Sequence, residues 1–165
     1  MPIKRRKSQT LVVLFFITAF VFIDQYLKAI VSSSLRLGES RVLIKNFLYV
    51  TLVRNTGAAF GLFKNSTAVF IAVSIVSVLF IALLIVNSIK KGDLLYRPMF
   101  NMGLILILSG AFGNLIDRIR LGYVIDFIDV RIWPVFNIAD SIITIGAILI
   151  LLPLFATVDK DRKPA

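Results

Sequence analysis

The chain has 165 residues, of which 58% are hydrophobic and only 17% are charged, so it carries more apolar surface than the core of one small domain can hide. Its net charge of +10 comes largely from basic residues at the ends of apolar runs, which indicates membrane orientation and argues against nucleic-acid binding. The absence of Cys and His excludes thiol catalysis, disulfides, Cys/His zinc sites and Ser-His-Asp arrangements, and leaves carboxylates, Ser, Thr, Lys and Tyr for any hydrolytic chemistry.

Four apolar runs are long enough to cross a membrane as helices, which takes about 20 residues each. They predict an α-helical membrane protein built as a single domain, residues 1–165, with transmembrane helices over residues 11–31, 67–86, 98–116 and 137–158. An alternative interpretation of the first run is a cleaved signal peptide, because four basic residues precede it. No A-x-A cleavage site follows that run, and Asp24 and Lys28 stand where a cleavage region is small and neutral.

Basic residues in the short segments that flank these runs predict the orientation. Residues 1–10, residues 87–97 and the segment after residue 158 together carry ten Lys and Arg. Because an even number of spans puts these segments on one side, that side is predicted to be cytoplasmic. Residues 32–66 and 120–136 are then extracytoplasmic (periplasmic). The first of these also carries five Lys and Arg, so the N-terminal cluster dominates the assignment.

A small β-sheet is predicted between the first and second helices. Residues 41–44 and 47–53 are rich in β-branched and aromatic residues, and residues 45–46 suit a turn between two strands. Residues 55–57 are a second turn signal, leading towards the second helix. The high apolar content of the strands predicts that the sheet lies on the outer membrane face, against lipid or a lipid-like ligand.

Polar residues on three separate helices are predicted to lie at one depth in the membrane. With a rise of about 1.5 Å per residue, Asp24 lies about 21 Å from the cytoplasmic end of its helix, Asn114 about 24 Å and Asp140 about 27 Å. The hydrocarbon core is about 30 Å thick, so all three lie just beneath the outer surface. Ionisable residues inside a membrane are costly, and their convergence at one level predicts a functional site there.

Helical spacing groups the polar residues further. Asn114, Asp117 and Arg118 lie on one face of the third helix, and Asn137 and Asp140 share a face at the start of the fourth. A structural alternative for Asp117 and Arg118 is an ion pair or an interfacial anchor. Asp140 alone would also be stabilised in the first turn of a helix by the helix dipole, with no chemical role.

Other residues have structural alternatives of the same kind. Asp24 and Lys28 would form a local pair that snorkels outwards. Asp129 and Arg131 would form a solvated pair in a loop. The small residues within 109–113 would let two membrane helices approach closely.

Two aspartates near the outer membrane surface offer a hydrolytic mechanism. Asp126 precedes the fourth helix and Asp140 opens it, so their 14-residue spacing permits them to meet. Two carboxylates at short range cannot both ionise, and they share a proton. One would then act as general base on a water molecule, while the other, protonated, would polarise the carbonyl of the scissile bond.

At these residues the chain resembles the bacterial lipoprotein signal peptidase (signal peptidase II) family. Five segments carry the resemblance in the family's order: residues 24–28 (DQ with Lys28), 55–61 (NTGAAFG), 110–118 (GAFGNLIDR), 124–127 (VIDF) and 136–141 (FNIADS). Each motif is weak by itself. Together with the four apolar runs they are specific, and they extend from the first run to the last.

The resemblance implies a role for each matching residue. Asp126 and Asp140 would be the catalytic pair, and the supporting residues around them would be Asp24, Asn55, Gly57, Asn114, Arg118, Asn137 and Ala139. The implied fold has four transmembrane helices, a periplasmic β-cradle and a short periplasmic helix between the third and fourth spans. No metal or other cofactor is expected.

The resemblance also implies an activity, that of an intramembrane aspartic endopeptidase. Its substrates would be prolipoproteins that carry diacylglycerol on a Cys, cut on the amino side of that Cys, and the cyclic peptide globomycin would inhibit it. The enzyme would be a monomer in contact with membrane lipid. It would lie in the bacterial cytoplasmic (inner) membrane, with both termini cytoplasmic and the active site near the outer face.

Two other functions stay open from the residues alone. A small transporter or channel would place polar residues at several depths along a pathway, whereas here they gather at one end. A membrane assembly or scaffold protein would use its polar residues only to tie helices together, and it would tolerate Asp→Asn changes.

Overall fold

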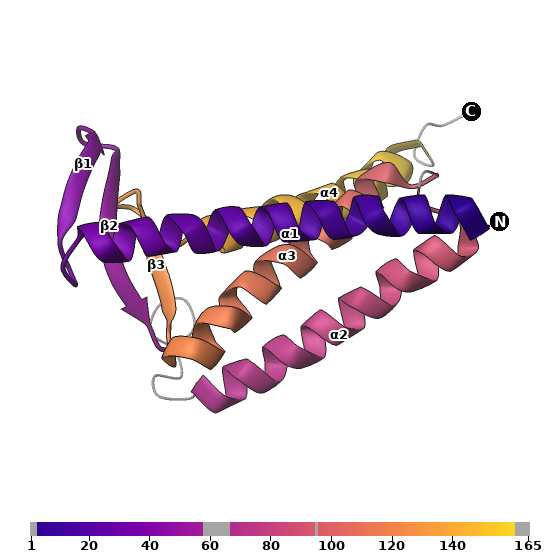
Figure 1. Cartoon of the computed structure of the whole chain (residues 1–165). Helices are drawn as coiled ribbons and strands as arrows, with labels where there is room; N and C mark the ends of the chain where they lie inside the picture. Colours follow the sequence, from indigo (N-terminus) through magenta and orange to yellow (C-terminus); the bar gives the residue numbers. More distant parts are fainter. Residues whose placement is uncertain (1–2, 58–66, 95, 161–165) are drawn as a thin grey trace.

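A computed structural model of the chain describes residues 3–57, 67–94 and 96–160. Within these residues the helices form an elongated bundle, with the strands gathered at one end and the start of α1 and the end of α4 at the other (Figure 1). The helices are α1 Ile3–Ser34, α2 Thr67–Lys91, α3 Pro98–Leu121 and α4 Ile138–Lys160, and the strands are β1 Ser40–Ile44, β2 Leu48–Asn55 and β3 Val124–Asp129.

Three helices among the described residues are long and apolar enough to cross a membrane. They are α2, α3 and the segment Arg5–Ser34 of α1, whereas the apolar segment of α4, Ile138–Pro153, is shorter. The outer surface of α2 is apolar, with Val76 66% and Leu83 68% exposed, as expected where lipid replaces water. The prediction of a mostly helical membrane protein is confirmed in this form.

The centre of the bundle is α3, which packs against the other three helices. Its contact with α4 is closest at glycines. A Cβ atom on Gly110 would lie 2.4 Å from the carbonyl oxygen of Ala139. A Cβ atom on Gly103 would lie 2.6 Å from the carbonyl oxygen of Gly146. Larger residues at these positions would force the helices apart, so the packing role predicted for residues 109–113 is confirmed at Gly110.

The three strands form one antiparallel sheet in the order β1–β2–β3. The predicted hairpin is confirmed, and its turn places Asn46 in the left-handed region at φ 62°. The sequence did not predict β3, and the short helix expected before α4 is wrong, because residues 122–137 hold β3 and no helix. Almost every residue of β3 is buried, so the strand lacks the alternation of apolar and polar residues that marks a half-exposed strand.

The sheet is anchored on the C-terminal end of α1. Val31 and Leu35 of α1 pack in one cluster with Leu52 of β2 and with Ile125 and Phe127 of β3. This cluster fixes β3 against the helices.

The helices extend beyond the predicted spans, because hydropathy marks only the apolar part of a helix. α3 continues five residues past 116, to Leu121, and ends at Gly122, which adopts the left-handed conformation at φ 81°. The connection between α3 and β3 therefore begins at residue 122. α1 and α2 are likewise longer than the runs 11–31 and 67–86.

Candidate active site

The two predicted aspartates come together at one residue, Asn137. Asp126 lies in β3, and Asp140 lies in the first turn of α4. The side-chain amide of Asn137 donates a 2.7 Å hydrogen bond to Oδ1 of Asp126, and its backbone N–H donates a 3.2 Å bond to Oδ2 of Asp140. One fully buried residue therefore holds both carboxylates where the sheet meets the helices.

Asn137 also caps α4. Its Oδ1 accepts the backbone N–H of Asp140 at 2.9 Å, while the carboxylate of Asp140 accepts the backbone N–H of Asn137. This reciprocal pair is a capping box, which satisfies N–H groups that a helix leaves free at its start. Asp140 thus has the capping role considered from the sequence, and its Oδ1 remains available for a second contact.

Asp126 is also held from the sheet. Asn55, the last residue of β2, donates from Nδ2 to Oδ2 of Asp126 at 2.9 Å. The backbone N–H of Gly57 donates to Oδ1 of Asn55 at 3.0 Å, which fixes the direction of the amide. Both oxygens of Asp126 therefore accept a hydrogen bond from an asparagine. Residues 58–61 of the predicted motif lie outside the described residues.

Asn114 reaches Asp140 from α3. Its Nδ2 donates to Oδ1 of Asp140 at 2.8 Å. Its own Oδ1 accepts from Nζ of Lys28 at 3.0 Å and from Nδ2 of Asn137 at 3.1 Å. Two donors at this oxygen leave one satisfactory orientation of the amide, with the NH2 group towards Asp140.

A cluster of buried charges from α1 and α3 adjoins the aspartates. Nζ of Lys28 lies 2.8 Å from Oδ2 of Asp24 and 2.9 Å from Oδ2 of Asp117, and none of the three side chains is more than 3% exposed. One structural alternative is therefore partly right and the other is wrong. Asp24 and Lys28 form a pair but do not reach outwards, and Asp117 pairs with Lys28 rather than with Arg118. Successive residues on a helix point in different directions, which separates Asp117 from Arg118.

Asp24 links this cluster to the start of α4. Its Oδ1 accepts the backbone N–H of Ala139 at 3.0 Å, one residue before Asp140. Gln25 ties α1 to α3 by donating to the carbonyl of Gly113 at 3.1 Å. Gly113 leaves the room that Asp24 needs, since a Cβ atom there would lie 2.7 Å from its Oδ2.

Arg118 lies near the aspartates without bonding to them. Its guanidinium stands over the ring of Phe70 in α2, 5.5 Å from the centroid, and makes no hydrogen bond or ion pair within the part of the chain that the structure describes. Its charge interacts electrostatically with Asp140 and Asp126. A partly buried guanidinium beside two acids can donate hydrogen bonds to a polar group of a ligand.

Burial raises the pKa of Asp126 to about 6. Hydrogen bonds from Asn55 and Asn137 oppose this shift, and the negative charge of Asp140 adds to it. A carboxyl group with a pKa near neutrality can both hold and release a proton under physiological conditions. The electrostatics therefore suit two acids that share one proton.

The other acid of β3, Asp129, belongs to a separate network on the sheet. It accepts hydrogen bonds from Oγ1 of Thr51 at 2.6 Å and from the backbone N–H of Arg131 at 2.9 Å. The guanidinium of Arg131 lies 3.7 Å from the carboxylate and stacks over the ring of Tyr49. The solvated loop pair expected here is partly wrong, because the pair exists but the Asp129 side chain is only 8% exposed.

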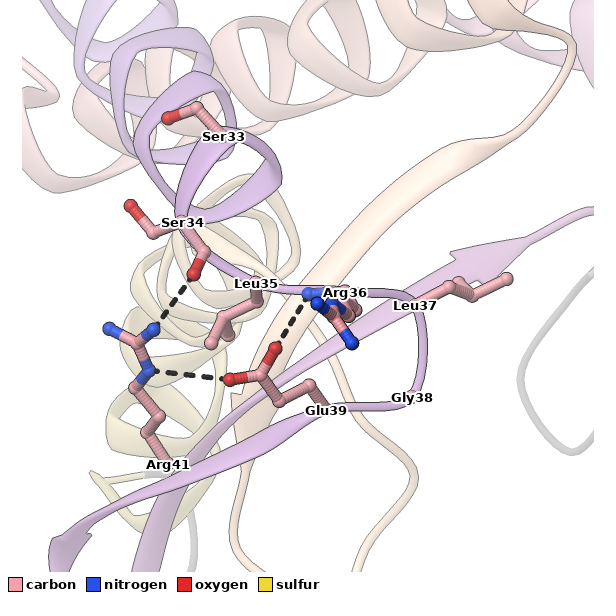
Figure 2. Close-up of a pocket in the computed structure, with 8 residues that line it drawn as sticks. All are labelled: Ser33, Ser34, Leu35, Arg36, Leu37, Gly38, Glu39 and Arg41. Atoms are coloured by element: carbon pink, nitrogen blue, oxygen red, sulfur yellow. Dashed lines mark hydrogen bonds and ion pairs between the residues drawn. The ribbon is translucent and has the colours of Figure 1, made fainter.

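Figure 2 shows a pocket at the junction of α1 and β1. Glu39 organises it by accepting the backbone N–H of Arg36 at 2.8 Å and pairing with Arg41 at 3.6 Å. Arg41 in turn donates to the carbonyl of Ser34 at 2.9 Å. None of the residues that surround the aspartates lines this pocket. The lining residues are Ser33, Ser34, Leu35, Arg36, Leu37, Gly38, Glu39 and Arg41.

Sequence reasoning placed Gln25, Lys28 and Asp117 in the family motifs but gave none of them a role at the aspartate site. Lys28 and Asp117 were given partners on their own helices, whereas their contact joins α1 to α3. Local spacing cannot show such a contact. Their predicted depth in the membrane could have indicated it, because Lys28 lies within about one helical turn of Asp24, and Asp117 within about one turn of Asn114.

The chain resembles known proteins over almost its whole length. A family model for signal peptidase (SPase) II matches residues 16–156. The lipoprotein signal peptidase of Moorella thermoacetica is 41% identical over 145 residues, which cover 86% of this chain and 92% of that protein. That of Caldanaerobacter subterraneus subsp. tengcongensis is 46% identical over 136 residues, 81% of this chain and 90% of the relative. That of Staphylococcus carnosus is 40% identical over 157 residues, which cover 92% of this chain and 94% of that protein.

A solved structure agrees with these sequence relatives. A bacterial membrane enzyme, determined by the in meso method at 2.3 Å resolution, matches with a TM-score of 0.79 and 34% identity over 93% of this chain and 94% of that one. The family match spans every residue of the aspartate site. The chain therefore belongs to the signal peptidase II family, and it is a protease that removes signal peptides from prolipoproteins.

Proposed function

We propose that Asp126 and Asp140 are the catalytic pair of this peptidase. The observation that carries the proposal is their shared partner: Asn137 donates to Asp126 at 2.7 Å and to Asp140 at 3.2 Å. Asp126 is buried, Asp140 is only partly so, and the raised pKa of Asp126 supports a proton shared at neutral pH. Such a pair can serve as general base and general acid together.

In this mechanism the ionised carboxylate takes a proton from a water molecule, whose oxygen attacks the carbonyl carbon of the scissile peptide bond. The protonated carboxyl group gives its proton to the carbonyl oxygen, which forms a neutral tetrahedral diol. The C–N bond then breaks. The nitrogen takes a proton from the first carboxyl group, and one diol hydroxyl returns a proton to the second. The pair ends with one proton, as it began.

The supporting residues act through these carboxylates. Asn55, Asn114 and Asn137 orient them with neutral donors, which add no charge to the site. Gly57 fixes the amide of Asn55 through its backbone N–H. The bonds from the three asparagines hold the carboxylates in place, which is the positioning that catalysis needs.

Three further residues complete the site. Asp24 and Ala139 fix the first turn of α4 through the 3.0 Å bond between them, and so fix Asp140. Arg118 has donors available for a carbonyl oxygen of the substrate.

The proposed substrate is a prolipoprotein that carries diacylglycerol on a Cys, cut on the amino side of that Cys. The aspartates lie at the end of the apolar helices, where a lipid-bearing residue would place its peptide bond beside the membrane surface. The β1 hairpin exposes apolar side chains near this end, with Val42, Leu43 and Ile44 each more than half exposed. This surface suits acyl chains or a signal helix.

The proposed topology has α4 as a fourth span. Its 23 residues extend about 34 Å, enough to cross the hydrocarbon core. The start of α1 and the end of α4 lie at the same end of the bundle (Figure 1), as both termini would in the cytoplasm. The protein then lies in the bacterial inner membrane with its active site and sheet near the outer face. In this proposal it works as a monomer without metal or other cofactor, and globomycin inhibits it.

The test is cleavage of a diacylated prolipoprotein by purified protein in detergent. Wild type is compared with Asp126→Asn and Asp140→Asn, and circular dichroism and thermal unfolding check the fold of each. Both variants are expected to fold and to lose activity by at least about 1000-fold, because neither retains an acid and a base.

Asp129→Asn is the matched control, because Asp129 lies in the same strand as Asp126 but bonds to Thr51 and Arg131 instead. It is expected to cleave at the wild-type rate. Normal cleavage by folded Asp126→Asn or Asp140→Asn would rule out the proposed pair. Cleavage of prolipoprotein without diacylglycerol at the same rate as the diacylated substrate would rule out the proposed substrate class.

A further inference from the structure

Lys28 is a charged residue that the proposed mechanism does not use, yet it is 1% exposed and lies next to the aspartates. We infer that Lys28 is a positioning residue of this peptidase: its ammonium group fixes the amide of Asn114 that holds Asp140, and its charge sets the pH range over which the aspartate pair is active. The inference rests on the proposed catalytic pair.

The ammonium group of Lys28 has three N–H donors, and three acceptors surround it. They are Oδ2 of Asp24 at 2.8 Å, Oδ2 of Asp117 at 2.9 Å and Oδ1 of Asn114 at 3.0 Å. Burying an ammonium group is costly unless charges and hydrogen bonds compensate for the lost water. The complete set of partners therefore places this atom at one point, between α1 and α3.

The contact with Asn114 reaches the aspartates in one step. While Nζ of Lys28 occupies Oδ1 of Asn114, the NH2 group of that amide must face Asp140, to which it donates at 2.8 Å. Asn137 donates to the same oxygen, but at 3.1 Å and without a formal charge. Without Lys28 the amide can rotate, and its oxygen would then meet the carboxylate of Asp140 in place of a donor.

The charge of Lys28 acts on the aspartate pair as well. The charged groups around Lys28 and the aspartate pair come from several elements. They are Asp24, Asp117, Arg118, Asp126 and Asp140. Asp24, Asp117 and Lys28 together carry a charge of −1, and they would carry −2 without the lysine. Added negative charge makes it harder for the pair to ionise, so activity would need a higher pH.

A merely structural lysine would behave differently. Its loss would loosen the bundle and reduce the amount of active enzyme, but it would leave the pH dependence of the remaining activity where it was. The pH–rate profile therefore separates a positioning role from a structural one.

The test measures kcat, KM and the pH–rate profile for Lys28→Met and Lys28→Arg with diacylated substrate. Lys28→Met keeps most of the length without the charge. Its kcat is expected to fall about 100-fold with little change in KM, because the carboxylate loses its fixed orientation. Both limbs of its pH–rate profile are expected to move to higher pH by about one unit. Lys28→Arg keeps the charge, so its limbs are expected to stay at the wild-type pH.

The double variant Lys28→Met/Asp117→Asn separates orientation from charge. It restores the cluster to a charge of −1 but leaves Oδ1 of Asn114 without the ammonium group. Its pH limbs are expected to return towards the wild type while kcat stays low. The double variant also serves if Lys28→Met alone does not fold, because it leaves one buried acid, Asp24, without the ammonium group, whereas Lys28→Met leaves both Asp24 and Asp117 without it. Lys91→Met, at the exposed end of α2, is the matched control and is expected to match wild type.

A folded Lys28→Met with wild-type kcat and pH limbs would overturn the inference. So would a loss of kcat with unmoved limbs, which would make Lys28 structural, or a double variant with wild-type kcat. Asp126→Asn and Asp140→Asn are measured alongside. If those variants stay active, the proposed pair fails; if they are inactive while Lys28→Met is normal, only the role of Lys28 fails.

Discussion

Asn101 and Asn114 lie thirteen residues apart on α3, and both are buried, at 2% and 6% exposure. Asn101 lies near the start of the helix, at the end of the bundle away from the sheet. Its partners are uncharged groups of α2 and of the turn that joins α2 to α3. It accepts from the hydroxyl of Ser88 in α2 at 2.7 Å and donates to the backbone carbonyls of Asp93, Leu94 and Arg97 in the turn. It closes a turn.

Asn114, at the other end of the bundle, joins ionisable side chains from two other helices. It accepts from Lys28 at 3.0 Å and donates to Asp140 at 2.8 Å. Burial, residue type and helix are the same for the two asparagines, but the chemistry of their partners differs. A buried polar residue in a membrane bundle therefore indicates function only when its partners can change protonation or bind a ligand.

The largest expected effect that separates the two asparagines is on catalysis. Asn114→Ala removes a hydrogen bond to one oxygen of Asp140 and leaves Lys28 without one acceptor. We expect kcat to fall roughly 100- to 1000-fold, in the range seen when a single active-site hydrogen-bond donor is removed. Steady-state cleavage of diacylated prolipoprotein in detergent measures it. A change in KM alone would mean that Asn114 binds substrate and does not orient Asp140.

The second effect is on the pH dependence of stability. Burial holds the pKa of Asp126 at about 6, above its ordinary value of 3.8. A raised pKa in the folded state means that the contribution of Asp126 to stability is fully present below about pH 4 and is lost as the pH rises towards 6, by up to about 3 kcal/mol. Asp126→Asn cannot ionise and should lose this dependence.

Thermal or denaturant unfolding in detergent between pH 4 and 7 measures this slope. Asn101→Ala is the informative companion, because it changes a buried polar group with no ionisable side-chain partner and should keep the wild-type slope. An Asp126→Asn protein with an undiminished slope would place the titrating group elsewhere in the chain.

The third effect is the cost of losing Asn101 itself. Asn101→Ala leaves three backbone carbonyls and the hydroxyl of Ser88 without this partner. We expect the free energy of unfolding to fall by about 2 kcal/mol, with kcat per folded molecule unchanged. Equilibrium unfolding and an activity assay on the same preparation measure both quantities. A substantial loss of kcat would connect this end of the bundle to the site and break the comparison.

Much of this arrangement follows from the sequence. Hydropathy indicated the helices, β-branched residues indicated the hairpin, and the rise per residue put Asp24, Asn114 and Asp140 at one level. The family resemblance singled out Asn55 and Asn137, whose amides the structure places on Asp126. These features depend on local composition or on position along a helix, which the sequence displays directly.

The rest depends on contacts between distant segments. The pairing of Lys28 with Asp117 was missed because the assigned partners, Asp24 and Arg118, lie on the same helices and are nearer in sequence. β3 was missed because it is buried on both faces and so shows no period of two. In each case a tertiary contact decides the outcome, and no local pattern reports it.

Asp129 offers the smallest and sharpest test, because it is an acid like Asp126 in the same strand. Burial acts to raise the pKa of Asp129, but hydrogen bonds from Thr51 and from the backbone of Arg131 outweigh it and lower the pKa. A lowered pKa means that ionised Asp129 stabilises the fold above about pH 4, and that this contribution is lost as the pH falls below its folded-state pKa.

Thr51→Val keeps the shape of the side chain but removes its 2.6 Å hydrogen bond to Asp129. We expect a loss of about 1.5 kcal/mol in unfolding free energy at pH 7, shrinking as the pH falls below 4, with no change in kcat. Unfolding at pH 7 and pH 3 and a cleavage assay measure these quantities. Asp129 would then behave like Asn101, as a structural group, although it is an aspartate three residues from Asp126 in the same strand. A fall in kcat would instead show that a change at Asp129 reaches the aspartate site through the sheet. The partners of a buried acid would then no longer suffice to tell a structural group from a catalytic one.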